Sequence, residues 1–482
     1  MTLQTPARPL RWPDAVHTLR ELLADRFPEV YLVGGTVRDA FWGLPVHDID
    51  LAVESQAFAV ARHIANALGG AFYKLDPARE TGRAILTING ETLAVDVACF
   101  RGPDLHTDLL GRDFTLNAVA VPLNSDLTQV IDPLDGLQDA TNRVLRRCSP
   151  DSIRSDPVRA LRAVRLAVRF GLRIEPTTLA DIREFGPLLV NTSPERIRDE
   201  FIALLGTPRA MAGIRTLKAL NLLHRILPEL SAERPEEEIR SILHVADKLA
   251  GIIDTISPRR TDNTAAQAGL GMIVYYLDRY RAALWDHLAA HWPNNRPHTA
   301  LLMLSALLSA PHPATVPPES IRDAIQLRGD ALRLSRDESE RIATTVLTHR
   351  RAATLLAQQA INRRISYRYW RDLGPAGVDA LLLSLAHTLA EAGPTLSTDH
   401  WSHLLQNADT LLSGYFPPEG QPRITDLPVL LTGKDLMRQF NLSPGPQIGE
   451  LLEAVREAQA VQEIATRQEA EALVAQLLSE KK

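Results

Sequence analysis

The stretch LVGGTVRDAFWGLPVHDIDLAV, residues 32–53, decides the fold of the N-terminal part of the chain. A β-like run at 30–33 stops at Gly34 and Gly35, and a segment with helical character follows at 36–42. Glycines permit a tight turn in which backbone N–H groups approach a phosphate, and a helix N-terminus favours an anion. We therefore predict a strand, a phosphate-binding turn and a helix in this order.

The same stretch ends in two aspartates that alternate with apolar residues, Asp48 and Asp50. Residues two apart on a strand point to the same face, so the two carboxylates should lie side by side. They would repel each other without a cation between them, and oxygen ligands select Mg²⁺ or Mn²⁺. This arrangement suits two-metal phosphoryl transfer. The alternative interpretation is a solvated, Asp-rich turn.

A third carboxylate belongs to a later strand-like segment. Residues 71–100 read as strands separated by turns, and Asp96 is the only charged residue of the alternating run LAVDVAC at 93–99. If Asp96 points inward, it completes the metal site. If it lies on an edge strand, it faces water.

The size and composition of the chain restrict its class. Its 482 residues suggest three or four domains, and 45% hydrophobic with 23% charged residues is ordinary for a globular protein. No apolar run approaches the roughly 20 residues of a membrane span, and the N-terminus lacks an apolar signal stretch, so we expect a cytoplasmic protein without membrane contact. The two cysteines, Cys99 and Cys148, are too few for a disulfide framework.

The net charge of −5 conceals a local excess of positive charge. Residues 143–173 contain nine arginines and only two acidic residues. Any surface that binds nucleic acid should include this stretch.

Four motifs follow one another in the chain. The glycine turn with its aspartates is followed by RDFTLNA at 112–118, DPLDGLQD at 132–139 and DPVRALRAVRLAVRF at 156–170. In this order they resemble the bacterial tRNA nucleotidyltransferase and poly(A) polymerase family. The resemblance implies an α+β fold with a nucleotidyltransferase head, built of a small mixed sheet with helices, and an elongated all-α neck, body and tail. The expected boundaries are 1–147, 148–208, 209–415 and 416–482.

The resemblance also implies roles for individual residues. Asp48 and Asp50 would be the catalytic ligands of Mg²⁺ or Mn²⁺, with Asp96 as an additional ligand. The residues that would contact the nucleoside triphosphate fall into three groups: Gly34, Gly35 and Arg38 at the phosphates, Arg112 and Asp113 beside the ribose, and Asp156, Arg159, Arg162 and Arg165 around the base.

The chemistry of base selection can be argued from the side chains themselves. A carboxylate accepts hydrogen bonds and a guanidinium donates them. Cytosine and adenine each offer an amino donor beside a ring-nitrogen acceptor, whereas uracil and guanine present the opposite order. Asp156 and Arg159 therefore suffice to accept CTP and ATP. The alternative is that Asp156 only caps a helix whose arginines are solvated.

The segment 156–170 itself is predicted to be helical, with Pro157 in the first turn and Gly171 as the stop. At about 100° per residue, Asp156, Arg159 and Arg162 share one face, and Arg165 drifts away from it.

Three features depart from the family pattern. Ser155 stands where a glutamate is common, so Arg159 needs another partner to orient it, and Gly111 replaces the first of two arginines. The segment 101–110 is shorter than the flexible loop of CCA-adding members. Members with a short loop resemble those that add only two cytidines and leave the adenosine to a separate A-adding enzyme.

The C-terminal half is helical in pattern. Its 210–413 region resembles a degenerate HD-related body, but it contains no His-Asp dipeptide, and His387 stands where an aspartate is usual. Without the dipeptide and its supporting carboxylates, we predict an RNA-binding or packing role for this body. The alternative is a metal cluster formed by His244, His287, His291, His349 and His387.

The last segment resembles the family's tail, which would grip the acceptor arm of tRNA. The candidate contacts are Lys434, Gly445 and Gly449, because glycines at a helix start expose backbone N–H groups to phosphate. A capped helical hairpin fits the same residues.

The resulting prediction is a template-independent RNA nucleotidyltransferase. It would add CMP from CTP, with AMP from ATP as a further product, to the 3′ end of tRNA. The alternatives are a bacterial poly(A) polymerase, an RNA-binding protein whose active site has lapsed and an HD phosphohydrolase with a nucleotidyltransferase appendage.

Overall fold

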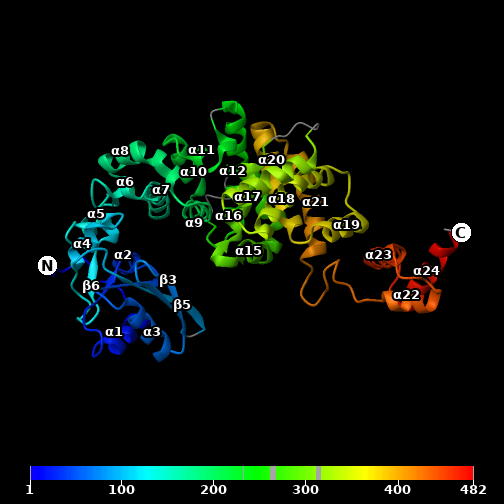
Figure 1. The fold of residues 1–482 in the computed structure, drawn as a ribbon. Coiled ribbons are helices and arrows are strands. Elements are labelled where there is room, and N and C mark those ends of the chain that lie inside the picture. Colours follow the sequence, from blue (N-terminus) through cyan, green and yellow to red (C-terminus); the bar gives the residue numbers. More distant parts are fainter. Residues whose placement is uncertain (1, 89, 232, 261–267, 311–315, 481–482) are drawn as a thin grey trace. The chain divides into compact units, whose positions relative to one another are not determined.

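The computed structural model describes residues 2–88, 90–231, 233–260, 268–310 and 316–480. The chain divides into two compact units (Figure 1). The first contains Met1–Phe201 and Ala212–Ile226, and the second contains Ile202–Met211 and Leu227–Lys482. Each unit is described by itself.

The first unit is built around a six-stranded sheet in the order β3-β4-β5-β2-β1-β6. Neighbouring strands are antiparallel except β2 and β5, which run parallel. The strands are β1 (Val30–Val33), β2 (Asp48–Val53), β3 (Ala71–Asp76), β4 (Thr81–Ile88), β5 (Glu91–Cys99) and β6 (Ala120–Pro122). The predicted strand at 30–33 and the strands within 71–100 are confirmed.

Helices cover the two faces of this sheet. The helices of the head are α1 (Asp14–Leu23), α2 (Gly35–Trp42), α3 (Ala57–Ala67), α4 (Leu105–Leu110) and α5 (Gly136–Thr141). Helix α3 packs on β3, β4 and β5. On another face, Ala52 of β2 joins a buried apolar cluster with Leu105 and Leu109 of α4. Side chains alternate along β2, so Asp48 and Asp50 lie on the Ala52 side of the strand.

The glycine turn and the segment 101–110 of the head are both well defined. The helix α2 begins at Gly35, directly after Gly34, whose φ of 69° is in the left-handed region that glycine adopts without strain. The short segment 101–110 is folded, because Asp104 accepts a hydrogen bond from the Thr107 N–H and thereby caps α4.

A helical region follows the head. Its helices are α6 (Ser152–Ser155), α7 (Val158–Phe170), α8 (Pro176–Phe185), α9 (Pro194–Leu205), α10 (Ala210–Ala219) and α11 (Leu223–Ile226). The short strands β7 (Val144–Leu145) and β8 (Arg173–Ile174) pair in parallel. Gly171 ends α7 in a left-handed conformation with φ of 64°, as predicted.

The base-reading segment differs from its prediction in one respect. Asp156 is not part of the helix but lies between α6 and α7, with φ of −145° and ψ of 85°. The residue that precedes a proline is biased away from the helical region, and Pro157 follows here. No side chain caps α7, so the alternative that Asp156 is simply its cap is wrong.

The second unit is mainly helical. Its longer helices are α12 (Glu236–Ile256), α14 (Ala268–Leu277), α15 (Arg281–Leu288), α16 (His298–Leu308), α17 (Pro318–Ala331), α18 (Arg336–Leu356), α19 (Arg363–Leu373), α20 (Ala376–Ala392) and α21 (Thr398–Tyr415). The strands β9 (His291–Trp292) and β10 (Arg296–Pro297) form a small antiparallel ribbon. Helix α20 packs against α12, α16 and α18 and is almost entirely buried, so it forms the centre of this core.

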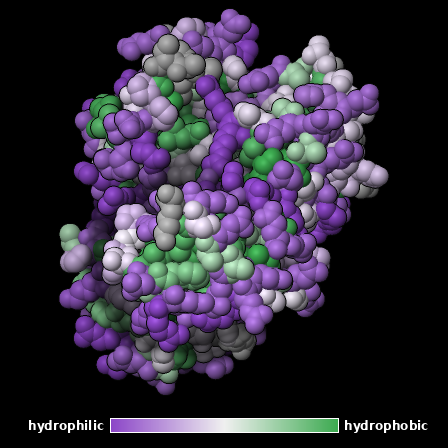
Figure 2. All heavy atoms as spheres, turned by 90° about the vertical axis from the view of Figure 1, so that its right-hand side faces the viewer, coloured by the Kyte–Doolittle hydropathy of each residue, from purple (hydrophilic) through white to green (hydrophobic). Residues whose placement is uncertain are grey.

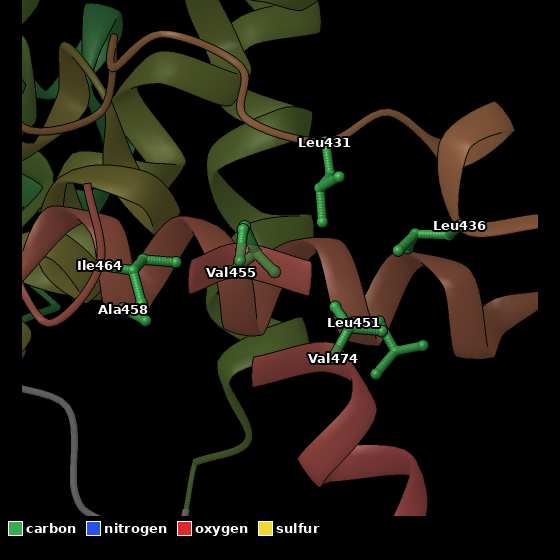
Figure 3. Close-up of a cluster of buried hydrophobic side chains, with 8 residues drawn as sticks. Leu431, Leu436, Leu451, Val455, Ala458, Ile464 and Val474 are labelled. Atoms are coloured by element: carbon green, nitrogen blue, oxygen red, sulfur yellow. The ribbon is translucent and has the colours of Figure 1, made fainter. Parts of the chain in front are cut away.

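The C-terminal residues have a small core of their own. The helices α22 (Gly433–Phe440), α23 (Pro446–Ala460) and α24 (Arg467–Glu480) surround it. Figure 3 shows its side chains, among which Leu436, Leu451 and Val474 are fully or almost fully buried. Arg368 of α19 donates two hydrogen bonds to Glu457 of α23 and so joins this hairpin to the body.

The described residues contain no single helix that is long and apolar enough to cross a membrane. Within the described part of the chain, α19 and α20 together are long and apolar enough, but they are bent by 109° relative to each other. The face drawn in Figure 2 is mainly hydrophilic, and its hydrophobic residues lie in separate small patches.

Candidate active site

Three aspartates meet where β2 and β5 run side by side. The register of the two parallel strands places Asp50 directly opposite Asp96, with Asp48 opposite Ala94. Asp48 is exposed, whereas Asp50 and Asp96 are partly buried. The sheet therefore brings the third predicted carboxylate next to the first two.

The glycine turn holds Asp50 from the other side. The Thr36 hydroxyl accepts a hydrogen bond of 2.7 Å from the Asp50 N–H and donates one of 3.3 Å to the Asp48 carbonyl. The Gly35 N–H donates to the Asp50 carboxylate. A Cβ at Gly34 would lie 3.0 Å from Oδ2 of Asp50, so this position needs glycine for close approach as well as for its φ.

Electrostatics at Asp50 fit a bound cation. The pKa of Asp50 is raised to about 6: burial is the largest cause, the Asp96 and Asp48 carboxylates add to the rise, and Arg112 and the Gly35 N–H oppose it. The site thus holds more negative charge than its own donors balance. Carboxylate oxygens are the ligands that Mg²⁺ and Mn²⁺ prefer, so the donor set and the charge fit such an ion.

Asp96 has a partner that the sequence did not indicate. Arg83 of β4 lies opposite Asp96 in the antiparallel register with β5. Its Nε and Nη2 donate hydrogen bonds of 2.7 Å to the two oxygens of Asp96. In this structure a guanidinium therefore pairs with Asp96. The alternative that Asp96 lies on an edge strand is wrong, because β5 lies between β4 and β2, and the role of Asp96 as a metal ligand stays a prediction.

Arg112 points toward the turn. Its Nε and Nη2 donate to Oδ2 of Asp108, at 3.0 and 2.8 Å, and its Nη1 would lie 3.3 Å from a Cβ at Gly34. Asp108 also accepts from the Arg101 N–H. The folded segment 101–110 thus orients an arginine of the nucleotide-binding set.

Arg38 is buried beneath the turn instead of projecting from it. Its Nε and Nη2 both lie 2.8 Å from Oδ1 of Asp39, and its Nη1 donates a hydrogen bond of 2.7 Å to Asn117. The guanidinium also packs over the ring of Phe170, 4.6 Å from its centroid. Each nitrogen of Arg38 has an acceptor within the chain.

Asp113 is the buried centre of a network. Its carboxylate accepts hydrogen bonds from the Phe114 N–H, from the Asn117 side-chain amide at 3.1 Å and from Nη1 of Arg162 at 3.2 Å. Burial alone would raise the pKa of Asp113, but Arg162 and the amide donors outweigh it and hold the pKa below its usual value. Asp113 therefore stays ionised and fixes the arginine.

Asp156 and Arg159, the pair predicted to read the base, are held by backbone carbonyls and by a second helix. Nη1 of Arg159 donates to the Arg112 carbonyl and to the Ser152 hydroxyl, at 3.0 and 2.9 Å, and its Nη2 donates to the Gly111 carbonyl at 3.0 Å. The Nε of Arg159 lies 3.5 Å from Oδ2 of Asp156. These contacts orient Arg159 in place of the glutamate that Ser155 replaces.

Helix α9 supplies the remaining partners. Nη2 of Arg196 donates to Oδ2 of Asp156 at 2.7 Å, and the Glu200 carboxylate accepts hydrogen bonds of 2.7 Å from Arg162 and Arg165. Arg165 is predicted to drift off the face that Asp156, Arg159 and Arg162 share, and Glu200 joins it to Arg162. Residues three apart are neighbours on a helix, and Glu200 holds both guanidinium groups.

Sequence reasoning missed five partners that complete this site: Thr36, Arg83, Asp108, Arg196 and Glu200. Three of them carried a usable signal. Asp108 stands four residues before Arg112, and Arg196 and Glu200 are separated by one helical turn. Thr36 and Arg83 gave none, because only strand pairing and the turn bring them to the aspartates.

The residues predicted to contact tRNA, Lys434, Gly445 and Gly449, lie at the starts of α22 and α23. Lys434 is exposed in the first turn of α22, Gly445 precedes α23, and Gly449 lies in the first turn of α23. A Cβ at either glycine would meet no atom within 4 Å. Packing inside the described chain therefore does not require glycine at these two positions.

The five candidate histidines of the body do not form one cluster. His244 and His291 are exposed. His287 contacts Asp379, and with His298 these residues form the one group of three possible metal ligands found among the described residues, with ligand atoms within 4.8 Å of one another. His298 and Asp379 were not among the candidates from sequence.

His349 and His387 form a separate pair, with ring centroids 4.5 Å apart. Burial lowers the pKa of each to about 4, with a contribution from His387 at His349 and from Arg350 at both.

Comparisons with known proteins give consistent matches. Family models match residues 30–146 (poly A polymerase head domain), 171–234 (probable RNA and SrmB-binding site of polymerase A) and 423–475 (putative tRNA nucleotidyltransferase domain 2). The chain is 31% identical over 446 residues to a CC-adding tRNA nucleotidyltransferase of Geobacter sulfurreducens, covering 92% of this chain and 91% of the relative. It is 34% identical over 472 residues to an A-adding tRNA nucleotidyltransferase of Deinococcus radiodurans, covering 93% and 95%.

Solved structures share the fold. A CCA-adding enzyme in its apo form aligns with a TM-score of 0.61 and 21% identity over 97% of this chain and 93% of that chain. The Thermotoga maritima CCA-adding enzyme in complex with tRNA aligns with a TM-score of 0.60 and 20% identity over 99% and 100%.

The paired aspartates, the glycine turn and the arginine-rich helix define a nucleotidyltransferase. With relatives matched over nearly their whole length, the chain belongs to the tRNA nucleotidyltransferase family. The family and the α+β fold class predicted from the sequence are confirmed.

Proposed function

We propose that this enzyme transfers CMP from CTP to the 3′ end of tRNA, with AMP from ATP as the further nucleotide that its base-reading residues admit. The observation that carries this proposal is the register of β2 and β5, which joins Asp48, Asp50 and Asp96 beside the glycine turn. The relatives support transfer to tRNA, but one is CC-adding and the other A-adding, so the product is decided by experiment.

In the proposed site, Asp48 and Asp50 would hold Mg²⁺ or Mn²⁺, with Asp96 as a further ligand once Arg83 releases it. Two such ions supply activation of an attacking hydroxyl and stabilisation of the triphosphate charge. The chain would supply the rest: backbone N–H groups at the start of α2 would face the triphosphate, and Arg112, whose Nη1 lies close to Gly34, would add positive charge there.

Selection of the base would fall to Asp156 and Arg159. The hydrogen bond that Asp156 accepts from Arg196 is made by Oδ2 and not by Oδ1. The two Nη atoms of Arg159 already donate to carbonyls of the chain and to Ser152. An incoming cytosine or adenine would therefore meet a fixed acceptor and a guanidinium with few donors left, which suits one hydrogen bond from each residue.

The acceptor arm of tRNA would contact the C-terminal hairpin through Lys434 and the backbone near Gly445 and Gly449. The open space around both glycines supports close approach of a phosphate to the start of α23.

The decisive experiment uses tRNA that lacks its terminal CCA, with CTP alone, ATP alone and both, and reads product length. Two added residues with CTP, and no more with both nucleotides, identify a CC-adding enzyme; three residues with both identify a CCA-adding enzyme. Long adenosine tracts would identify a poly(A) polymerase. The Asp50→Asn variant should add nothing while retaining tRNA binding, and normal incorporation by this variant would refute the proposal.

A further inference from the structure

Three arginines gather where the segment 101–110 ends. Nη1 of Arg101 donates a hydrogen bond of 3.3 Å to the Gly111 carbonyl, and Nη2 of Arg159 donates one of 3.0 Å to the same oxygen. The carbonyl of the next residue, Arg112, accepts from Nη1 of Arg159 at 3.0 Å. These residues form an arginine cluster that consists of Arg101, Arg112 and Arg159.

A buried carboxylate holds two members of the cluster in place. Oδ1 of Asp108 accepts a hydrogen bond of 3.1 Å from the Arg101 N–H, and its Oδ2 accepts from Nε and Nη2 of Arg112. Asp108 itself is buried within the folded segment. The backbone of Arg101 and the side chain of Arg112 are therefore oriented by the same group.

Arg101 has no carboxylate of its own. Among the described residues, no acidic side chain forms an ion pair with Arg101, and its Nε and Nη2 make no hydrogen bond. Two acidic residues act on its charge, Asp108 and Asp113. Each of them is already paired with another arginine, Asp108 with Arg112 and Asp113 with Arg162. The guanidinium of Arg101 thus carries a positive charge that the described chain leaves without a direct partner.

The surroundings of Arg101 are unfavourable for this charge. Although the residue is exposed overall, its guanidinium lies among protein atoms, and this burial lowers its pKa. Arg112 and Arg159 lower the pKa further, and Asp108 and Asp113 oppose the change. Arginine is not deprotonated in proteins, so the repulsion between the guanidinium groups persists. An anion that binds between them would relieve it.

The place and the shape of the free donors indicate which anion fits. Nη1 of Arg112 would lie 3.3 Å from a Cβ at Gly34, so the cluster borders the glycine turn. A guanidinium binds two oxygens at once through its Nε and Nη2, as Arg83 does at Asp96. In Arg101 these two nitrogens are free, and phosphate oxygens match their geometry.

We propose that Arg101 is a further substrate-binding residue, which binds a phosphate group through its free Nε and Nη2 beside the glycine turn. The inference rests on the proposed function, because that reaction brings phosphate to the site from two sources. One is the triphosphate of the incoming nucleotide, and the other is the backbone at the 3′ end of the RNA. In either case Arg101 contributes to affinity for one substrate and not to the transfer step.

The test compares the full-length wild type with Arg101→Gln in Mg²⁺. Calorimetry measures the Kd for CTP, and filter binding measures the Kd for tRNA that lacks its terminal CCA. We expect about tenfold weaker binding of one of the two ligands, the effect of roughly one lost charge-assisted hydrogen bond. Weaker binding of CTP identifies the triphosphate as the bound group, and weaker binding of tRNA identifies the RNA backbone. The kcat at saturating substrates should stay within about twofold of the wild type, since the contact is made before the transfer step as well as during it.

A second variant separates substrate binding from support of the fold. Arg101→Lys keeps the charge but lacks the paired donors, so it should recover part of the lost affinity. Arg79→Gln removes an exposed arginine from the turn between β3 and β4, and it should bind both ligands as the wild type does. Circular dichroism verifies that each variant is folded.

Different results would overturn this inference and the proposed function. Unchanged Kd values for both ligands in folded Arg101→Gln would overturn the role of Arg101. Equal losses for CTP and tRNA together with a lower Tm would also overturn it, because they would show a purely structural contact with Gly111. A wild type that binds both ligands but adds no nucleotide would refute the proposed function, while the Kd values would still test Arg101. A wild type that binds neither ligand would refute both.

Discussion

Arg83 and Asp96 form a two-fold hydrogen-bonded ion pair, with both N···O distances at 2.7 Å, between neighbouring strands of the catalytic sheet. The pair places a fixed positive charge beside the carboxylates that should bind metal. It neutralises Asp96 while no metal is bound, so metal and guanidinium compete for the same oxygens.

Replacing this guanidinium should therefore strengthen metal binding. Arg83→Gln removes a charge that repels the incoming cation, and we expect Mn²⁺ affinity to rise by roughly fivefold, equivalent to about 1 kcal/mol at this partly exposed position. Electron paramagnetic resonance of free Mn²⁺ measures this affinity. Arg79→Gln, in the turn between β3 and β4, is the control and should change nothing. Equal or weaker affinity in Arg83→Gln would show that the pair only supports the sheet.

The raised pKa of Asp50 makes stability depend on pH. In metal-free protein, Asp50 has a pKa of about 6 when folded and an ordinary, lower value when unfolded. As pH rises from 4 to 6 the unfolded chain loses its proton first, so the fold loses stability over this interval. Asp50→Asn should raise the free energy of unfolding by about 1–3 kcal/mol at pH 8 and by little at pH 4. Urea titrations at both pH values measure this difference, and a gain that is the same at both would contradict it.

Arg196 should tune nucleotide selection through Asp156. Arg196→Met removes the donor that fixes one oxygen of Asp156, so the carboxylate becomes mobile and reads the base less strictly. We expect the ratio of kcat/KM for CTP over UTP to fall about tenfold, the effect of roughly one lost hydrogen bond to a charged group. Arg209→Met, at an exposed position, serves as the control. An unchanged ratio together with a lower Tm would assign Arg196 a purely structural role.

Glu200 should contribute more to the free energy of unfolding than the adjacent Asp199 does. Glu200→Gln leaves Arg162 and Arg165 without their shared carboxylate in a largely buried place, and we expect a loss of about 3 kcal/mol in the free energy of unfolding. Asp199→Asn is the adjacent control; its side chain is 62% exposed, and surface pairs contribute about 1 kcal/mol or less. Similar losses in both variants, measured by denaturant unfolding, would contradict the special role of Glu200.

The tail prediction concerns affinity for tRNA. Lys434→Ala should weaken binding and reduce the slope of log K against log salt by about one, because one phosphate contact is lost. Filter binding at several salt concentrations measures the slope. The control is Arg79→Ala, which removes an exposed charge from the N-terminal unit and should leave the slope unchanged. Equal slopes for the wild type, Lys434→Ala and Arg79→Ala would exclude Lys434 from the tRNA interface.

The sequence by itself determined the strand that carries Asp48 and Asp50, the glycine turn before α2, the arginine-rich helix ending at Gly171 and the family. These features are local: the two-residue period of β2 puts Asp48 and Asp50 on one face, and a glycine in the left-handed region ends α7. Spacing along the chain is enough to predict them.

Only the tertiary structure decided which partners hold these residues. Strand pairing brings Arg83 to Asp96, and α9 brings Arg196 and Glu200 to residues that precede them by 35 to 40 positions. Hydrogen bonds over such separations depend on the packing of whole elements, which no local pattern of residues encodes.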